Sequence, residues 1–202
     1  MPEKKQPAPI QGQAAHICVD MQNIFSGDSP WAVPWMDRIT GNVVDIVKQH
    51  TDATIFTRFV PARKPGNGMG LKWKEYYEAW ADMTLERLAP SMIDLIPALQ
   101  PFAEHATVVD KHVYSPWVES NLSGVLRHRD VETLVITGGE TEVCVLGTVM
   151  GAVDRGYRTI IVKDALCSSA DETHDAMMKI YCDRLGKQIE VVSSKELRTL
   201  WA

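Results

Sequence analysis

The sequence predicts an α/β protein. We expect a three-layer α/β/α domain whose six-stranded parallel sheet is doubly wound, with the strand order 3-2-1-4-5-6. Short runs of β-favouring residues alternate along the chain with longer segments of helical periodicity. Four of the predicted strands are almost continuous apolar runs, which is the pattern of parallel strands buried on both faces. Repeated β-α units with such strands favour an open sheet covered by helices on both sides.

The elements follow one another in a regular order. The six predicted strands are 15–20, 53–59, 106–111, 133–139, 158–165 and 189–192. Helical periodicity occupies 35–50, a stretch within 71–100, 117–129, 141–156, 171–186 and 194–201. The longest irregular segment, 60–90, is rich in Gly, Pro and aromatic residues. Because no repeat or linker divides the chain, we expect one domain over 14–202, preceded at 1–13 by a mobile tail or an arm on a neighbouring subunit.

Composition excludes several classes of protein. At 202 residues, 45% hydrophobic and 23% charged, the chain has the composition of one folded globular domain. The net charge of −5 and the absence of a dense Lys/Arg run argue against a nucleic-acid partner. No stretch of about 18 apolar residues and no apolar signal segment are present, so no membrane partner is expected. The four cysteines form no C-x-x-C pair, which favours free thiols and a cytoplasmic location.

Three residues that can carry chemistry fall at the predicted carboxyl ends of strands, where ligands bind in such sheets. Asp20 closes the first strand, and Lys111 closes the third. Cys144 lies in GGETEVCVLG (138–147), in the first turn of the helix after the fourth strand. Each has an ordinary explanation by itself: a capping carboxylate, a solvated lysine and a packed thiol. Their convergence at one edge of the sheet favours a catalytic site.

The chemistry of these three residues is that of acyl transfer. A helix N-terminus and a nearby cation lower the pKa of a thiol below its free value of about 8.5, so Cys144 is expected to be a nucleophile. Asp20 can take the thiol proton and later return it to a leaving nitrogen, while Lys111 favours the thiolate. The turn GGET can aim backbone N–H groups at a developing oxyanion. The combination predicts hydrolysis of a small amide through a thioester.

Three motifs make the sequence resemble a known family. They are CVDMQNIF (18–25), VVDKHVYSPW (108–117) and VITGGETEVCVLGTVMGAVDRGY (135–157). From about residue 14 onward the chain resembles the isochorismatase-like cysteine hydrolases, which include nicotinamidases, N-carbamoylsarcosine amidohydrolases, and ureidoacrylate and biuret hydrolases. The resemblance implies a homodimer or homotetramer acting on a small-molecule amide or ureido substrate.

The resemblance also implies roles for individual residues. Asp20 would be the acid and base, Lys111 the third triad member and Cys144 the nucleophile. The peptide bond before the motif threonine, Glu140–Thr141, would be cis although no proline is involved. The amides of Thr141 and Cys144 would then form the oxyanion hole.

Two departures from branches of this family narrow the reaction. Nicotinamidases have an Asp-x-His pair after the second strand and a further histidine that hold a metal, but here the segment reads FTRFVPARKPG, without histidine. We therefore expect no metal and no cofactor, and we expect Asp171 and His174 only to cap and solvate their helix. True isochorismatases lack the cysteine, so Cys144 favours cleavage of a C–N bond of a linear amide. The alternatives are a nicotinamidase proper and a non-hydrolytic binding or scaffold protein of the same fold.

The substrate-binding residues are predicted from their position near the strand ends. The candidates are Gln22, Phe25, Arg58, Trp73, Tyr114 and Trp117. Aromatic side chains with a few polar ones are typical of small-molecule pockets, but Trp73 can also simply pack a loop or a subunit interface. Arg58 can bind a substrate carboxylate or pair with a local carboxylate such as Asp82. Gln22 can also serve only to hold a loop.

Overall fold

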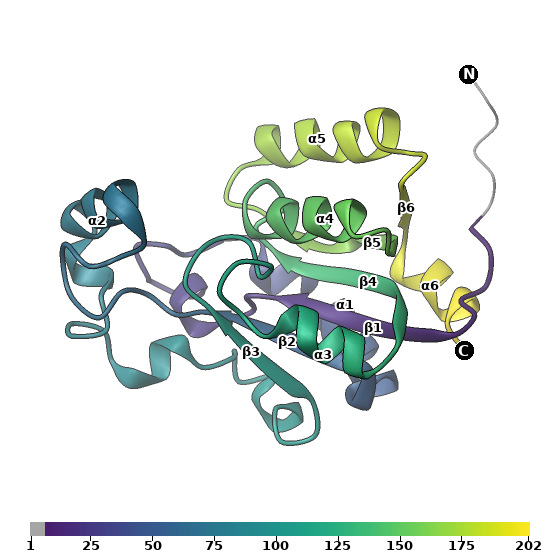
Figure 1. The fold of residues 1–202 in the computed structure, drawn as a ribbon, viewed down its shortest axis with the longest axis horizontal. Helices are drawn as coiled ribbons and strands as arrows, with labels where there is room; N and C mark the ends of the chain where they lie inside the picture. Colours follow the sequence, from purple (N-terminus) through teal and green to yellow (C-terminus); the bar gives the residue numbers. More distant parts are fainter. Residues whose placement is uncertain (1–6) are drawn as a thin grey trace.

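The computed structural model describes residues 7–202 and has the predicted architecture (Figure 1). One all-parallel sheet has the order β3-β2-β1-β4-β5-β6. The strands are β1 Gln13–Val19, β2 Thr54–Phe59, β3 Thr107–Lys111, β4 Val131–Gly139, β5 Arg158–Cys167 and β6 Ile189–Val192. The predicted doubly wound sheet and its strand order are confirmed.

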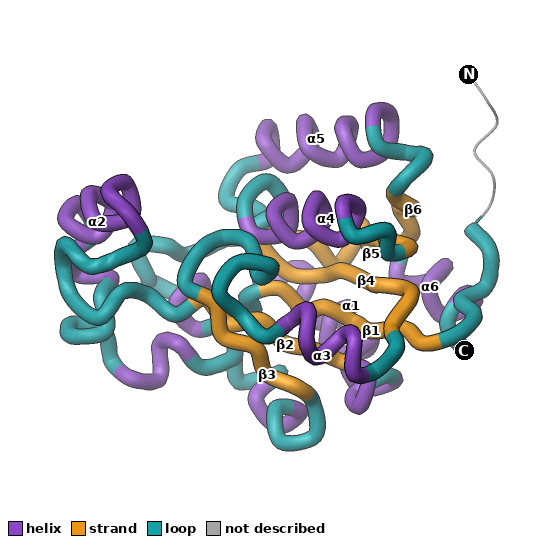
Figure 2. Tube along the Cα trace, in the orientation of Figure 1, coloured by secondary structure: helices purple, strands orange, loops and turns teal. Residues whose placement is uncertain are grey.

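Helices cover both faces of the sheet. They are α1 Met36–Gln49, α2 Gly70–Ala79, α3 Leu122–His128, α4 Cys144–Asp154, α5 Asp171–Lys179 and α6 Ser194–Leu200. Short turns of 3-10 helix occupy Asn23–Phe25, Thr51–Ala53, Ala81–Met83, Pro90–Ile93 and Gln100–Phe102, and a π-helical turn, Ile180–Arg184, extends α5. Helices α1 and α6 lie on one face, and α3, α4 and α5 lie on the other, whereas α2 stands clear of both helical layers (Figure 2). Within residues 7–202, no helix has both the length and the apolar composition needed to cross a membrane.

Two apolar cores lie on the two faces of the sheet because successive strand residues point to opposite sides. On β1, Ile17 and Val19 pack with α3 and α4, whereas Cys18 between them packs with α1. Both Cys18 and Cys167 are fully buried in the α1 core. These two thiols therefore serve as small apolar packing groups.

One buried polar residue interrupts the core of β1. The imidazole of His16 is fully buried and contacts the hydroxyl oxygens of Thr54, 3.1 Å from Nδ1, and Thr137, 2.8 Å from Nε2. Burial, with a contribution from His50, lowers the pKa of His16 to about 3. His16 is therefore neutral at ordinary pH and held between its two neighbouring strands.

The described part of the N-terminal segment lies against its own domain. The Arg158 guanidinium donates to the carbonyl of Pro9 at 3.1 Å and also to that of Ala8. The amide of Ile10 donates to the carbonyl of Leu200 at 2.7 Å. Residues 1–6, which belong to the predicted tail or arm, lie outside the described residues.

The largest difference from the predicted elements is at 117–129, where the helix begins only at Leu122. Glu119 has a left-handed backbone with φ 52°, which is incompatible with a helix running through 117–121. The preceding loop packs on α4 instead. A Cβ on Gly151 of α4 would lie 2.0 Å from the ring of Trp117, so the glycine leaves the space that the indole fills.

Candidate active site

The fold brings three side chains from distant parts of the sequence to the carboxyl edge of the sheet. Asp20 directly follows β1, Lys111 is the last residue of β3, and Cys144 is the first residue of α4. The ammonium of Lys111 lies 2.7 Å from Oδ2 of Asp20 and 3.4 Å from Sγ of Cys144. All three are buried, with exposed fractions of 1%, 0% and 6% for Asp20, Lys111 and Cys144. The arrangement places a cation in contact with both a carboxylate and a thiol.

Lys111 reaches the other two residues across the end of β2, which separates β3 from β1. Its register partner on β2 is Phe59, and its Nζ lies 5.1 Å from the centre of the Phe59 ring. Nζ also donates to the carbonyl of Val113 at 3.2 Å. The Lys111 side chain therefore extends past the end of β2 to reach both Asp20 and Cys144.

Asp20 is held by the neighbouring strand β2. Its φ of 50° is in the left-handed region, which a residue with a side chain adopts only where its surroundings impose it. The Thr57 hydroxyl donates to Oδ1 of Asp20 at 2.7 Å, and the amide of Asp20 donates to the carbonyl of Thr57 at 3.2 Å. Sequence reasoning missed Thr57, although its place on the strand beside the first one was a usable signal. Thr57 orients the carboxylate toward Lys111.

The pKa of the Cys144 thiol differs from the predicted one. Burial raises its pKa well above the ordinary value, and Asp20 adds to the rise, while the positive charge of Lys111 opposes it. The predicted lowering of this pKa is therefore wrong, because a nearly enclosed thiolate loses more hydration than one cation restores. Burial alone would lower the pKa of Lys111, but Asp20 and Cys144 outweigh it and raise that pKa. The resting site thus holds a neutral thiol beside an ammonium.

The turn between β4 and α4 contains a cis peptide bond at Gly139–Glu140. The expected position, Glu140–Thr141, is wrong by one bond. Glycine has no Cβ to crowd the close approach of the two Cα atoms, and a Cβ at Gly139 would lie 2.6 Å from Sγ of Cys167.

The same turn decides which amides can bind a ligand oxygen. The amide of Thr141 donates to the carbonyl of Cys167 at 2.9 Å, so it is not free to serve an oxyanion hole. Among the described residues, the amides of Glu140 and Cys144 donate to no other group of the chain. The available donors are therefore Glu140 and Cys144, in place of the predicted Thr141 and Cys144.

His174 supports this turn from α5, a contact that sequence reasoning did not find. Its Nδ1 lies 2.9 Å from Oγ1 of Thr141, and its ring packs on Trp35 with the ring centres 4.8 Å apart. The hydroxyl of Tyr181 donates to the carbonyl of Thr141 at 3.0 Å. The expectation of a solvated His174 is wrong, because only 8% of it is exposed. Residues thirty or more positions away thus fix the turn.

Aromatic rings gather beside the triad and form what we call the aromatic layer. Its members are Phe25, Trp31, Phe59, Trp73, Tyr76, Tyr77, Trp80 and Tyr114, connected by ring contacts with centres 4.9 to 6.5 Å apart. Burial raises the pKa of Tyr76 and of Tyr114, and electrostatic coupling to Cys144 contributes to both increases. These two rings therefore lie near the thiol, and three predicted substrate residues, Phe25, Trp73 and Tyr114, belong to the layer.

Two other predicted substrate residues hold the structure together instead. The amide nitrogen of Gln22 donates to the carbonyls of Phe59 at 3.1 Å and Ile93 at 2.8 Å, and its oxygen accepts from the amide of Phe59 at 2.6 Å. Gln22 is fully buried by these contacts and has no polar atom left for a substrate. Of its two alternatives, the structure favours the loop-holding one.

Arg58 is likewise engaged by its own chain. Its guanidinium donates to both carboxylate oxygens of Asp110, at 2.7 and 3.0 Å, and lies 3.6 Å from Asp94. The suggested partner Asp82 pairs with Arg87 instead, at 2.6 Å. Arg58 is therefore matched by two carboxylates, and its proposed role toward a substrate carboxylate is not supported.

Trp117 also lies outside the aromatic layer. Its Nε1 donates to the carbonyl of Thr148 on α4 at 2.8 Å, and its ring stacks on Tyr157 with the centres 5.9 Å apart. Because Gly151 leaves room for the indole, the ring packs the 113–121 loop on α4. The predicted substrate contact of Trp117 is corrected to a packing role.

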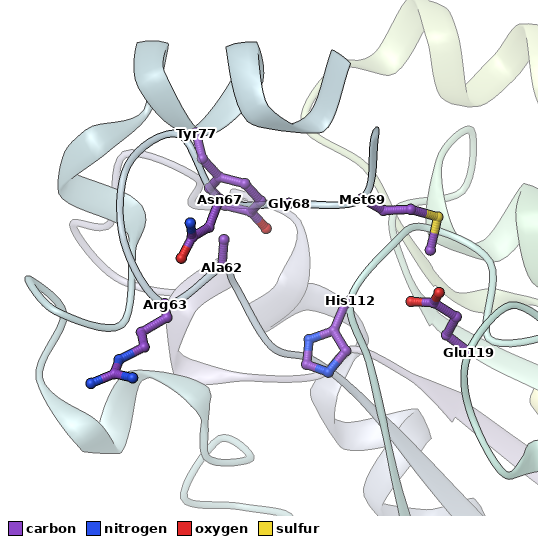
Figure 3. Close-up of a pocket in the computed structure, with 8 residues that line it drawn as sticks. All are labelled: Ala62, Arg63, Asn67, Gly68, Met69, Tyr77, His112 and Glu119. Atoms are coloured by element: carbon purple, nitrogen blue, oxygen red, sulfur yellow. The ribbon is translucent and has the colours of Figure 1, made fainter. Parts of the chain in front are cut away.

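A cavity of about 370 Å³ adjoins the aromatic layer (Figure 3). Tyr77 of the layer lines it together with polar residues that include Arg63, His112 and Glu119. The triad does not line this cavity, although His112 directly follows Lys111. Over residues 7–202, no group of three or more His, Cys, Asp or Glu side chains is placed to hold a metal ion.

Comparisons with known proteins identify the family and the fold. The isochorismatase domain model matches residues 14–193. Nicotinamidase 3 of Arabidopsis thaliana is 24% identical over 189 residues, covering 87% of this chain and 88% of that protein. The uncharacterized isochorismatase family protein YwoC of Bacillus subtilis (strain 168) is 32% identical over 79 residues. That match covers 39% of this chain and 42% of YwoC, so it spans less than half the length of that relative.

Solved structures show the same fold. A cysteine hydrolase from Pseudomonas syringae pv. phaseolicola 1448A superposes with a TM-score of 0.76 at 24% identity, covering 95% of each chain. N-carbamoylsarcosine amidase from Thermoplasma acidophilum superposes with a TM-score of 0.71 at 21% identity, covering 91% of this chain and 97% of the other. At these identities the likeness concerns the fold.

Proposed function

Since this chain belongs to the isochorismatase family, a family of hydrolases, we propose that it is a cysteine hydrolase that cleaves the C–N bond of a small linear amide, carbamoyl or ureido compound. The observation that carries the proposal is the position of Lys111, whose Nζ lies 2.7 Å from the Asp20 carboxylate and 3.4 Å from the Cys144 sulfur. A buried cation between a carboxylate and a thiol costs folding free energy, which a purely structural site has no reason to incur.

The first half of the proposed reaction forms a thioester. When substrate occupies the site, Asp20 takes the proton of the Cys144 thiol, and the sulfur attacks the carbonyl carbon. The negative charge that develops on the carbonyl oxygen is met by the free amides of Glu140 and Cys144. The tetrahedral adduct then breaks its C–N bond, and the leaving nitrogen takes the proton that Asp20 holds.

The second half releases the acid. Asp20, again a carboxylate, takes a proton from a water molecule that attacks the thioester carbon. The same two amides stabilise the second tetrahedral adduct, which breaks its C–S bond, and the sulfur recovers the proton from Asp20. Throughout, Lys111 keeps a positive charge beside whichever partner is negative, which the raised pKa of Lys111 supports.

This reaction needs no metal in the form proposed here. Residues 54–66 contain no histidine, so the sequence lacks the metal ligands that are typical of nicotinamidases at this position. We therefore place nicotinamide among the substrates to be screened and do not assign it. A purely binding or scaffold role is disfavoured because it gives no use for a cation buried against the thiol.

The experiment is an ammonia-release screen. Purified protein is incubated with nicotinamide, ureido acids, carbamoyl amino acids, and aliphatic and aromatic amides. Wild type and Cys182→Ala, which removes a half-buried thiol elsewhere, are expected to release ammonia from the same compound, whereas Cys144→Ala is expected to release none. Turnover that persists in Cys144→Ala would overturn the mechanism.

The predicted assembly is tested separately. We propose a homodimer or homotetramer that acts in the cytoplasm. Size-exclusion chromatography with light scattering measures the assembly, and a monomer at micromolar concentration would contradict it.

A further inference from the structure

His174 is a buried titratable residue that the proposed mechanism does not use. It lies on α5, and only 8% of it is exposed. Its Nδ1 lies 2.9 Å from Oγ1 of Thr141, in the turn that leads from β4 to Cys144. Within the described residues, this is the only hydrogen bond of its ring. The one polar contact of a buried imidazole is therefore made to the turn that carries the nucleophile.

The direction of this hydrogen bond follows from the partners of Thr141. The Thr141 hydroxyl has one hydrogen, which it donates to the carbonyl of Cys167 at 3.0 Å. The same carbonyl accepts from the amide of Thr141 at 2.9 Å. The Thr141 oxygen is left to accept from His174, which places a proton on Nδ1 of the imidazole. His174 therefore acts on the turn as a hydrogen-bond donor.

Tyr181 holds the other side of Thr141. Its hydroxyl donates to the Thr141 carbonyl at 3.0 Å, and its side chain is fully buried. Tyr181 lies in the π-helical extension of α5, about two helical turns after His174, so both side chains reach the same residue. Burial raises the pKa of Tyr181, with a contribution from Glu142, so the phenol keeps the proton that it donates. The amide, the hydroxyl and the carbonyl of Thr141 are thus all bound by residues outside the turn.

Thr141 lies between the two amides that are free to bind an oxyanion. Glu140 directly precedes it, and Cys144 ends the turn. The peptide group that joins Glu140 to Thr141 is fixed at both sides. Its N–H donates to the end of β5, and its C=O accepts from the amides of Val143 and Val145, each at 3.0 Å. The contacts of Thr141 therefore determine where the neighbouring free amides point.

Resting on the proposed function, we propose that His174 and Tyr181 are positioning residues that hold the two oxyanion-binding amides in place through Thr141. Donors that are already aimed at the developing charge stabilise the transition state because they need no reorganisation when the charge forms. A loosened turn still binds the substrate but stabilises the oxyanion less. Loss of either donor therefore lowers kcat and leaves KM nearly unchanged.

Two reagents that react with the same thiol separate oxyanion binding from thiol reactivity. With p-nitrophenyl acetate, the Cys144 sulfur forms an S–C bond through a tetrahedral oxyanion, the ester C–O bond breaks, p-nitrophenolate leaves, and Asp20 takes the thiol proton. Iodoacetamide alkylates the same sulfur by loss of iodide from a CH₂ carbon, and no oxyanion forms. The acylation rate is the initial p-nitrophenolate release that Cys144→Ala does not show. The alkylation rate is measured by mass spectrometry of the Cys144 peptide.

His174→Leu removes the donor and keeps a side chain of similar bulk. We expect the ratio of acylation to alkylation to fall at least about tenfold, as part of the roughly hundred- to thousandfold effect of losing one oxyanion donor. His174→Asn has a side-chain amide that can donate from near the place of Nδ1, so its ratio should return to within about threefold of wild type. With a substrate from the ammonia-release screen, His174→Leu should lower kcat and change KM by less than about twofold.

His50→Leu is the matched control. His50 stacks on Trp201 with the ring centres 3.8 Å apart, as His174 packs on Trp35, but it lies outside the turn. We expect the ratio of acylation to alkylation to be unchanged in His50→Leu. An equal fall in both leucine variants would overturn the proposal, as would a His174→Asn variant as impaired as His174→Leu, because lost packing would then explain the result.

Tyr181→Phe tests the proposal by itself if the His174 variants do not fold. It removes one oxygen atom, and we expect the ratio to fall several-fold. Tyr157→Phe, which removes the hydroxyl from a ring stacked on Trp117, should leave the ratio unchanged. An unchanged ratio in Tyr181→Phe contradicts the proposal. If wild-type Cys144 is alkylated but never acylated, the proposed function fails; if every variant is acylated as fast as wild type, only the present inference fails.

Discussion

The Lys111 ammonium lies 2.7 Å from the Asp20 carboxylate, and at most 1% of either side chain is exposed. Such a buried pair is weak evidence for stability, because desolvation of two charges offsets most of their attraction. Its value here is that it keeps a carboxylate and a thiol beside one cation. Measurements of the free energy of unfolding can distinguish the loss of one partner, which leaves the other charge buried alone, from the loss of both partners together.

Removal of one partner is predicted to destabilise the fold. Lys111→Met leaves Asp20 buried without a cation, and we expect a loss of about 3–5 kcal/mol in the free energy of unfolding. The double variant Asp20→Asn/Lys111→Met is expected to be more stable than Lys111→Met, because no unpaired charge remains, yet equally inactive. Urea unfolding of the two single variants and the double variant measures this coupling. Additive losses in the double variant would show that the two groups do not interact.

Asp20→Asn is predicted to separate thiol reactivity from turnover. The charge of Asp20 helps to raise the pKa of Cys144, so its removal lowers that pKa and increases the thiolate fraction at neutral pH. We expect faster alkylation of Cys144 by iodoacetamide at pH 7 than in wild type, and no ammonia release. The alkylation rate of wild type should keep rising above pH 9. A wild-type plateau below pH 8 would contradict the raised pKa.

Thr57→Val is predicted to reduce activity through Asp20. The Thr57 hydroxyl donates to Oδ1 of Asp20 at 2.7 Å, and a hydrogen bond to a charged group contributes about 1.5–3 kcal/mol. We expect kcat to fall at least about tenfold with little change in KM, since the hydroxyl orients the base. Thr57→Ser keeps the hydroxyl and should recover most of kcat. A serine variant as slow as the valine variant would mean that the methyl group matters instead.

His16 is predicted to make stability depend on pH. Its pKa is about 3 in the folded protein and about 6.5 in the unfolded chain. The unfolded chain binds more protons between these values, so stability is full above about pH 6.5 and falls as pH decreases toward 3. We expect a loss of about 3 kcal/mol between pH 7 and pH 4 from this residue. His16→Gln should show a flatter profile than His128→Gln, which replaces an exposed histidine.

Tyr114 and Trp117 are predicted to respond differently to substitution. Tyr114 belongs to the aromatic layer beside Cys144, so Tyr114→Ala should raise KM several-fold with little loss of stability, because 42% of the side chain is exposed. Trp117→Phe removes the hydrogen bond to Thr148 and part of the packing at Gly151. It should lower the melting temperature and leave KM unchanged. A raised KM in Trp117→Phe would restore its substrate role.

Strand positions were predictable because burial on both faces of a parallel sheet leaves a long apolar run in the sequence. The predicted strand 189–192 matches β6 residue for residue, and 158–165 lies within β5. The helix predicted at 117–129 was wrong at its start because its periodicity continues through a loop whose apolar residue, Trp117, packs on α4. Periodicity records burial and does not distinguish a helix from a loop that is buried.

The meeting of Asp20, Lys111 and Cys144 was predictable because the topology of a doubly wound sheet places strand ends at one edge. The protonation state of the Cys144 thiol was not predictable, because it depends on how much water reaches the sulfur. The sequence contains a cation and a helix start, both of which lower a thiol pKa, whereas the enclosure that outweighs them comes from distant segments. The sequence also left the roles of Gln22 and Arg58 undecided. Their hydrogen-bond partners Ile93 and Asp110 lie 71 and 52 residues away along the chain.

The sequence by itself determined the fold class, the strand order and which residues stand at the carboxyl edge of the sheet, because these follow from local pattern and from the topology that it implies. Only the tertiary structure decided which amides stay free, that His174 and Thr57 hold the turn and the base, and that the thiol is neutral at rest. The physical reason is that hydrogen-bond partners and burial are properties of three-dimensional neighbours. A residue's own position in the chain does not reveal them.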